Sequence, residues 1–173
     1  MRGERLEKNC GKLAGARGNR PGLLLKLELE SNPEALCLVR ATIERAAEVL
    51  EFPEADTRAI VRSVDEALAN VIRHAYGGKA GLPIEVRCNR VLAKSNRAGA
   101  RGLEILLEDE GDPQKPSEFK GRRLDEVRPG GLGLHFIRQS MDVVEFSRKK
   151  GKNQLRLVKY RSPAEQLPGS QGE

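Results

Sequence analysis

The sequence predicts an α+β domain in which helices cover one face of a mixed, mostly antiparallel sheet. Three observations lead to this class. Segments that alternate apolar and polar residues lie near both ends of the chain, two stretches with apolar residues at helical spacing follow each other, and a hairpin pattern comes late in the sequence. The length of 173 residues fits one domain, and 38% hydrophobic with 32% charged residues is typical of a globular protein.

The first strand is expected at Leu23–Glu30, where leucines alternate with charged residues. Ser31 and Asn32 can cap a helix that has Pro33 in its first turn. The apolar face of this helix would consist of Leu36, Val39, Ile43, Ala46, Ala47 and Leu50.

A second helix is expected from about Glu54 to Tyr76, directly after Pro53, with the glycines at 77, 78 and 81 forming the turn that closes it. Two strands, Ile84–Ala93 and Leu103–Glu108, follow around a polar turn. The apolar face of the second helix would consist of Ile60, Val61, Val64, Leu68, Val71 and Ile72.

The polar stretch from Asp112 to Arg128 is long for a loop inside a compact domain, which predicts a lid over a ligand. A helix at Gly131–Met141 comes next. The strands Val143–Arg148 and Leu155–Tyr160 then form a hairpin around Gly151.

The two ends of the chain differ in composition from the part between them. Residues 1–21 are basic, glycine-rich and without apolar periodicity, and residues 162–173 resemble them, so we expect a disordered arm and a flexible tail around a domain at 22–161. The chain has no run of about 18 apolar residues, so we expect no membrane span and a cytoplasmic protein. The widely spaced cysteines predict neither a zinc site nor a disulfide framework, and we expect Cys37 and Cys88 to be buried or half-buried.

A net charge of +6 raises the possibility of nucleic-acid binding. Only 3% of the residues are aromatic and tryptophan is absent, so platforms for base stacking are scarce. A solvated basic surface that faces an acidic protein is the better interpretation, and no direct contact with nucleic acid is expected.

Three polar residues stand four apart within the second predicted helix: Glu66, Asn70 and His74. A step of four residues turns an α-helix by only about 40°, so the three would share one stripe beside the apolar face. The Asn70 carbonyl oxygen suits Mg²⁺, and Glu66 can orient or deprotonate a nucleophile. A plain solvated stripe is the commoner meaning of such a pattern.

Two glycine-containing segments lie downstream. Asp109–Pro113 follows an apolar strand, where the Asp109 carboxylate can accept a hydrogen bond from an exocyclic amine while Gly111 lets a flat ring approach. Pro129–Ile137 passes from glycines into a helix, whose N-terminus favours phosphate. An ordinary turn and a flexible helix entry are the simpler alternatives.

The order of these motifs resembles the GHKL ATPases, the superfamily of gyrase, Hsp90, MutL and the histidine kinases. Glu66–Asn70 with His74–Tyr76 is similar to their N box, Asp109–Pro113 to the G1 box, and Gly130–Leu134 to the G2 box. The form EALxNxxxHAY is particularly similar to the anti-sigma-factor serine kinases. The resemblance covers about residues 23–161 and implies a Bergerat-type two-layer α/β sandwich that binds ATP with Mg²⁺.

The resemblance also implies roles for individual residues. Glu66 would be the general base, and Arg128 would neutralise the transferred phosphoryl group, with Arg122 and Arg123 as competitors for that role. Asn70 would be the magnesium ligand and Asp109 would bind the adenine amino group. The remaining nucleotide-binding residues would be His74, Gly111, Pro113, Gly130, Gly131, Leu132, Gly133 and Leu134.

The implied function is a protein-serine kinase that phosphorylates a STAS-type anti-sigma antagonist and sequesters a sigma factor. The resemblance also implies that the kinase can form a homodimer. One departure concerns the Gly-Thr pair that family members often carry before the last strand: here Lys152 and Asn153 follow Gly151, which affects one phosphate contact. A non-catalytic, ATP-gated binding module is therefore the second hypothesis. The detached ATPase half of a histidine kinase is rejected, because both histidines, His74 and His135, lie in the nucleotide motifs.

Overall fold

The computed structural model describes residues 22–93, 100–113 and 132–161. Within them the chain forms five strands, three α-helices and one short π-helix. In chain order these are β1 (Gly22–Glu30), α1 (Pro33–Val49), α2 (Glu54–Asn70), the π-helix η1 (Val71–Ala75), β2 (Pro83–Leu92), β3 (Arg101–Asp109), α3 (Leu132–Ser140), β4 (Val143–Lys149) and β5 (Lys152–Tyr160).

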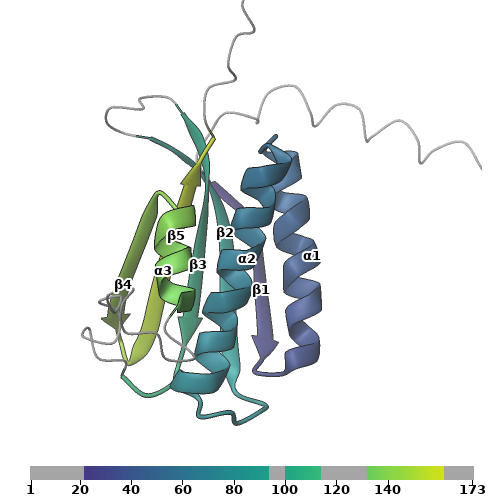
Figure 1. Cartoon of the computed structure of the whole chain (residues 1–173). Helices are drawn as coiled ribbons and strands as arrows, with labels where there is room; N and C mark the ends of the chain where they lie inside the picture. Colours follow the sequence, from purple (N-terminus) through teal and green to yellow (C-terminus); the bar gives the residue numbers. More distant parts are fainter. Residues whose placement is uncertain (1–21, 94–99, 114–131, 162–173) are drawn as a thin grey trace, which may run out of the picture.

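The strands form a single sheet in the order β1-β2-β3-β5-β4, and every pair of neighbours is antiparallel. All three α-helices lie on the same face of this sheet (Figure 1), with α2 between α1 and α3. The predicted two-layer α+β class is confirmed, but the sheet of the described residues is antiparallel throughout and not mixed. Two hairpins, β2–β3 and β4–β5, provide the local pairings, whereas β1–β2 and β3–β5 join strands that are distant in sequence.

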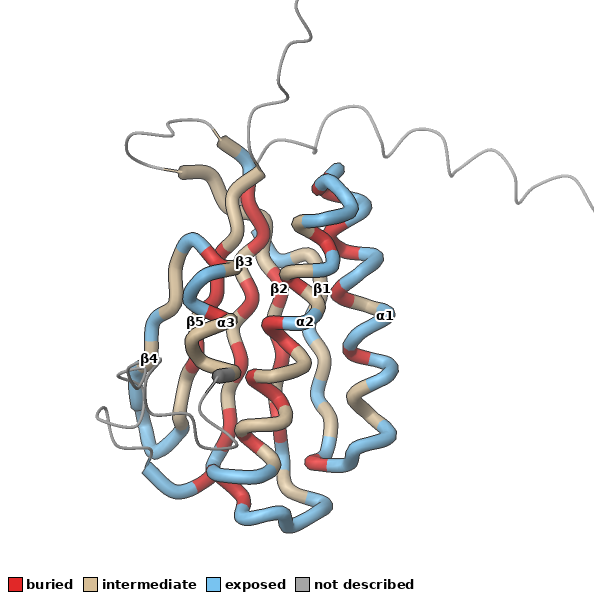
Figure 2. The backbone as a smooth tube through the Cα atoms, in the orientation of Figure 1, coloured by how far each residue is buried: buried red, intermediate tan, exposed pale blue. Residues whose placement is uncertain are grey.

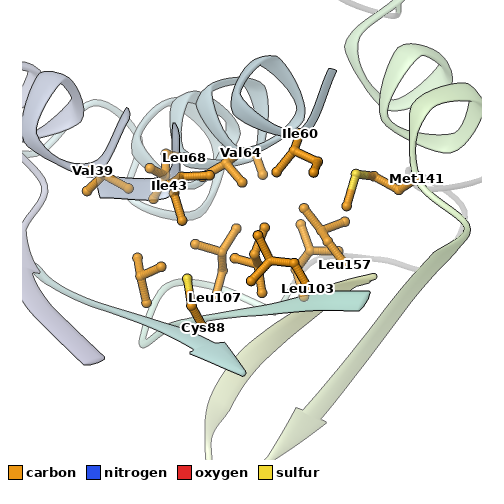
Figure 3. Packing of buried hydrophobic residues seen from close by; sticks show 14 of the residues in the cluster. Val39, Ile43, Ile60, Val64, Leu68, Cys88, Leu103, Leu107, Met141 and Leu157 are labelled. Atoms are coloured by element: carbon orange, nitrogen blue, oxygen red, sulfur yellow. The ribbon is translucent and has the colours of Figure 1, made fainter. Parts of the chain in front are cut away.

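The hydrophobic core fills the space between the helices and the sheet. Most residues of the predicted apolar faces of α1 and α2 are buried, and Figure 2 marks the buried positions of both helices in red. In Figure 3, Ile60, Val64 and Leu68 of α2 lie over Leu103, Leu107 and Leu157 of the sheet. Each of these leucine, isoleucine and valine side chains is 2% exposed or less. Burying one contributes about 1.5–3 kcal/mol, so this layer fixes α2 firmly on the sheet.

The start of α1 differs in one detail from the expectation. Only Asn32 caps the helix, because its side-chain oxygen accepts a hydrogen bond from the backbone N–H of Glu34 at 3.0 Å. Ser31 is buried instead. Its hydroxyl donates to the Lys79 carbonyl oxygen at 2.7 Å and accepts from the Leu82 N–H at 3.0 Å, which ties the end of β1 to the turn before β2.

The second predicted helix is not α-helical throughout. It is an α-helix only to Asn70, and the backbone then widens into η1, where the Tyr76 N–H donates to the Val71 carbonyl oxygen at 3.0 Å. Such π-turns cluster at functional sites. Because a wider turn changes the angular spacing of side chains, the helical stripe predicted through residues 66, 70 and 74 ends at Asn70: His74 is exposed, whereas Glu66 and Asn70 are half-buried.

The other face of the sheet carries charged side chains that pair with one another. Lys26 contacts Glu85 at 3.0 Å, Arg87 contacts both Glu85 and Glu108, and further along Arg156 contacts Glu104 and Glu145. Cross-strand ion pairs contribute only about 0.2–1 kcal/mol each. Their main effect here is that three basic residues of this face already have acidic partners.

Three further expectations can be compared with the described residues. Cys88 is buried as expected, but Cys37 is exposed, because it lies on the outer side of α1. No helix in the described part of the chain is long and apolar enough to span a bilayer. The predicted arm (1–21), tail (162–173), polar turn at 95–99 and most of the predicted lid lie outside the described residues.

Candidate functional site

The described parts of the three sequence motifs lie in or against one continuous helical segment formed by α2 and η1. Glu66 and Asn70 occupy the last two turns of α2, and η1 continues the same chain to Ala75. The segment after β3 packs against η1 through Gly111, and the first turn of α3 packs against α2 through Gly133. Segments from three separate parts of the sequence therefore come together along α2 and η1.

Gly133 in the first turn of α3 lies directly against Glu66. A Cβ placed on Gly133 would be 1.9 Å from Glu66 Oε1 and 2.3 Å from Cδ, so no other residue fits while the carboxylate keeps this position. The glycine thus allows the N-terminal end of α3 to approach the carboxylate. Arg62, one turn earlier on α2, reinforces the contact by placing its guanidinium 4.1 Å from the ring centroid of Phe136 on α3.

Gly111 makes the corresponding contact with η1. A Cβ at this position would lie 2.5 Å from the Ala75 carbonyl oxygen and 2.6 Å from the Ala75 Cβ. The next residue strengthens the junction, because the Asp112 N–H donates to the Ala75 carbonyl oxygen at 3.1 Å. Packing within the chain therefore requires a glycine at position 111, in addition to the room for a flat ring that the sequence predicts.

Tyr76 closes the same junction from the side. Its buried hydroxyl donates to the Pro83 carbonyl oxygen and accepts from the Glu110 N–H at 2.9 Å. It thereby links the end of η1 both to the start of β2 and to the turn after β3. Burial raises the pKa of this phenol, so the donor hydrogen is retained at neutral pH.

Asp109 is the last residue of β3, and only 6% of it is exposed. Its Oδ1 accepts hydrogen bonds from the Gly111 N–H at 2.9 Å and from the Asn153 side-chain amide at 2.7 Å. Burial raises the pKa of this carboxyl above its ordinary value of 3.8, while the two hydrogen bonds and Arg148 oppose the rise. A carboxylate held in this way can accept a hydrogen bond from an amino group of a ligand.

Sequence reasoning treated Asn153 only as a departure from the Gly-Thr pair and missed its contact with Asp109. The last strand was expected to begin at Leu155, but β5 begins at Lys152, so Asn153 pairs with Asp109 across the sheet. The alternation of apolar residues could have been extended backwards from Leu157 and Leu155 to position 153, which places its side chain on the helix-covered face.

The other predicted site residues fall into three groups. Leu132, Gly133 and Leu134 lie in the first turn of α3, as expected. His74 and Pro113 are exposed, and the structure brings neither of them to Asp109 or Glu66 through a described contact. Arg128, Gly130 and Gly131, together with Arg122 and Arg123, lie outside the described residues.

The described residues contain no group of three histidine, cysteine, aspartate or glutamate side chains that could hold a metal ion. Asn70 is half-buried in the last turn of α2 and offers one amide oxygen. Such a site does not suit zinc, which takes several nitrogen or sulfur ligands. It suits Mg²⁺, which takes one or two protein ligands and completes its shell with phosphate oxygens and water.

The fold and the site define the class of protein, and a family comparison agrees with them. Residues 29–159 match the model of the histidine kinase-like ATPase domain. The chain therefore belongs to the histidine kinase-like ATPase family, which confirms the resemblance found in its sequence and identifies ATP as the expected ligand of the site.

Two relatives that are similar in sequence to this chain carry the names of protein kinases. The chain is 29% identical over 136 residues to the serine-protein kinase RsbW of Bacillus pumilus, covering 74% of this chain and 80% of the relative. It is 30% identical over 105 residues to the serine/threonine-protein kinase BtrW of Bordetella bronchiseptica, covering 57% and 67%. Both names agree with the kinase activity that the sequence predicts.

A solved structure shares the fold. The crystal structure of the RsbU and RsbW domains of Rv1364c from Mycobacterium tuberculosis superposes with a TM-score of 0.55 at 18% identity, over 84% of this chain. The chain spans about a third (34%) of that longer protein.

Proposed function

We propose that this protein is an ATP-dependent serine kinase that phosphorylates a STAS-type anti-sigma antagonist and also sequesters a sigma factor. The observation that carries the proposal is the contact between Glu66 and Gly133. It holds a carboxylate against the first turn of α3, and phosphates are expected at the N-terminus of such a helix. A general base beside the transferred phosphoryl group is what a kinase requires.

In this proposal each residue has a defined task. Asp109 accepts a hydrogen bond from the adenine amino group, and the N-terminal turn of α3 with Gly130 and Gly131 contacts the phosphates. Asn70 would supply one oxygen ligand to Mg²⁺, whose charge would stabilise the phosphates during transfer. Arg128 neutralises charge on the γ-phosphoryl group.

The chemical step moves one proton and one phosphoryl group. Glu66 takes the proton of the serine hydroxyl as the serine oxygen attacks the γ-phosphorus, and the bond to the β-phosphate oxygen breaks. The products are phosphoserine and ADP. Three features of the relatives and the sequence support this reaction: the names of RsbW and BtrW, the resemblance to anti-sigma kinases, and the pairing of Glu66 with Asn70 on one stripe.

The test is transfer of labelled phosphate from ATP to the STAS-domain proteins of the same organism, incubated one at a time with the chain. Glu66→Gln should lose transfer by about 10²–10⁴-fold, the usual effect of a general base, while ATP binding remains. Asp65→Asn is the matched control, because Asp65 is the neighbouring acid on α2 and pairs with Arg40 instead, at 2.8 Å. Equal transfer by Glu66→Gln and the unchanged protein would refute the role of Glu66.

The second candidate function is an ATP-gated binding module without kinase activity. The missing Gly-Thr pair favours it, because Lys152 and Asn153 follow Gly151 here and a departure near the nucleotide can accompany loss of catalysis. This candidate predicts nucleotide-dependent binding of the same partner with no phosphoserine formed at any time. Mass spectrometry of the partner after incubation distinguishes the two.

Further parts of the proposal concern the assembly and the surroundings. A sigma factor is the sequestered partner, and two copies of the chain associate, as the resemblance implies. The protein acts in the cytoplasm, where ATP and sigma factors are found. The catalytic domain comprises residues 22–161, and the two ends lie outside it. Gel filtration coupled to light scattering, with and without a sigma factor, tests the stoichiometry.

A further inference from the structure

Asn153 occupies the rung of the sheet opposite Asp109, at the end of the β3–β5 ladder. Its side-chain nitrogen donates to Asp109 Oδ1 at 2.7 Å and to the Asp112 carbonyl oxygen at 3.1 Å, with the Gly111 carbonyl oxygen at 3.3 Å. One amide therefore contacts both the buried carboxylate and the backbone of the turn that follows it. Asn153 itself is half-buried.

The orientation of this amide is fixed by its neighbours. Arg148 Nη1 contacts Asn153 Oδ1 and also donates to the Gly111 carbonyl oxygen at 3.2 Å. A guanidinium can only donate hydrogen bonds, so it must face the oxygen of the amide and not its nitrogen. The nitrogen is consequently turned toward Asp109, where it has an acceptor.

These contacts make the two oxygens of the Asp109 carboxylate different from each other. Both hydrogen bonds from described residues fall on Oδ1, one from Asn153 and one from the Gly111 N–H. A carboxylate anchored through one oxygen has a fixed plane, and its other oxygen keeps its lone pairs for a ligand. Hydrogen bonds to a charged group are among the stronger ones in proteins, so this anchoring is substantial.

We propose that Asn153, oriented by Arg148, is a positioning residue that fixes the Asp109 carboxylate and thereby sets the preference of the site for adenine over guanine. The inference rests on the proposed function, because it assumes that Asp109 meets the base of a nucleotide. Adenine presents an amino donor at position 6, whereas guanine presents a carbonyl acceptor at that position. A rigid acceptor discriminates well between them, since guanine would leave a buried carboxylate facing another acceptor.

The same contacts indicate what the Asn153 amide offers in a chain that lacks the Gly-Thr pair. A threonine hydroxyl has one hydrogen to donate, whereas the Asn153 amide has two hydrogens and an acceptor oxygen. The amide can therefore bind the carboxylate and the turn together while accepting from Arg148 on β4. In this chain the end of β4 becomes part of the support of the base site.

The test measures dissociation constants of Mg·ATP and Mg·GTP by calorimetry for the full chain and four variants. Asn153→Leu keeps the size of the side chain and removes its hydrogen bonds. It should weaken ATP binding by about tenfold or more, the usual loss for hydrogen bonds to a charged group, and lower the ATP-to-GTP preference by a similar factor. Gln154→Leu is the matched control, because Gln154 is the next amide on β5 but contacts Glu108 on the opposite face of the sheet. It should change neither quantity more than about twofold, because Gln154 contacts Glu108 and Ser147 and not Asp109 or the turn after it.

Arg148→Met provides a second route if Asn153→Leu fails to fold. Arg148 is exposed, so its replacement should leave the domain folded while freeing the Asn153 amide to rotate. The ATP-to-GTP preference should fall in the same direction by a smaller factor. Thermal unfolding of each variant without nucleotide serves as the folding control.

The outcomes separate this inference from the proposed function. If the unchanged chain binds ATP, Asp109→Asn does not, and Asn153→Leu keeps both affinity and preference, the role of Asn153 is overturned and the nucleotide site stands. If the unchanged chain does not bind ATP at millimolar concentration, the proposed function and this inference fall together. A loss of ATP affinity with an unaltered preference over GTP also overturns it, because a purely structural role would produce that result.

Discussion

Replacing Gly133 with alanine tests whether the position of the Glu66 carboxylate governs phosphoryl transfer. The added Cβ would lie 1.9 Å from Glu66 Oε1, whereas ordinary contact requires about 3.4 Å. The conflict involves Glu66 Oε1, Cδ and also Cγ, which would lie 2.6 Å from the added Cβ, so the whole side chain must turn and the carboxylate must move by about 1.5 Å or more, the difference between the first two distances. The backbone of α3 need not shift.

The size of the effect follows from that displacement. A misplacement of about 1 Å at a reacting group can reduce a rate by about 10²-fold, so we expect a loss of at least about 10²-fold in transfer to serine. Folding should not suffer, because alanine is favoured over glycine in a helix by about 0.5–1 kcal/mol. The variant should therefore be folded, stable and slow.

Gly111→Ala is the contrasting variant. Its Cβ would meet the Ala75 carbonyl oxygen at 2.5 Å, and this neighbour is backbone, which cannot rotate away. We expect a loss of about 1–3 kcal/mol in the free energy of unfolding, as for other overpacked positions. Urea unfolding without nucleotide and single-turnover transfer with saturating ATP separate the two variants. Unchanged transfer by Gly133→Ala would refute the link between this contact and catalysis.

Three further predictions concern the supports of the site. Tyr76→Phe removes hydrogen bonds to the Pro83 carbonyl oxygen and the Glu110 N–H, so thermal or urea unfolding should show a loss of about 1–3 kcal/mol, and an unchanged midpoint would contradict the role of that hydroxyl. Burial raises the folded-state pKa of Asp109 above 3.8, so the stabilisation that comes from the protonated Asp109 carboxyl is full below pH 3.8 and is lost as the pH rises through the folded-state pKa. The side chain in Asp109→Asn stays neutral at every pH. In urea unfolding at pH 7 this variant should therefore have a free energy of unfolding equal to or above that of the unchanged protein, while its ATP affinity is lost. Burial raises the pKa of the Cys88 thiol to about 12, so iodoacetamide at pH 8 should modify exposed Cys37 in the native protein and Cys88 only after denaturation, as peptide mass spectrometry would show.

Much of the fold was predictable because its signals are local and strong. The apolar faces of α1 and α2 repeat at helical spacing over four turns or more, and the alternation in β1, β2 and β3 matches strands with one covered face. The order of the Glu66–Asn70, Asp109–Pro113 and Gly130–Leu134 motifs then identified the family, because three ordered motifs are far more specific than any one of them.

The details that escaped prediction depend on contacts between distant residues. Nothing local marks the π-turn after Asn70, which accompanies the close approach of Gly111 to Ala75 from another part of the chain. Asn153 and Lys152 are polar and follow a glycine, so they looked like a turn, whereas pairing with β3 draws them into the sheet. Cys37 was expected to be buried or half-buried, but it lies outside the apolar face of α1 and is exposed.

The place of Asp109 on the last rung of the β3–β5 ladder has a consequence for hydrogen exchange. Ladder ends open more readily than their middles, so the Gly111 amide, which bonds to Asp109 Oδ1, should exchange with solvent faster than the amides of Ile105 or Leu157 in the free protein. A nucleotide that binds Asp109 would hold this end closed and slow that exchange. The bound base would then hold the end of the β3–β5 ladder together. Protection of the Gly111 amide alone would report occupancy of the site.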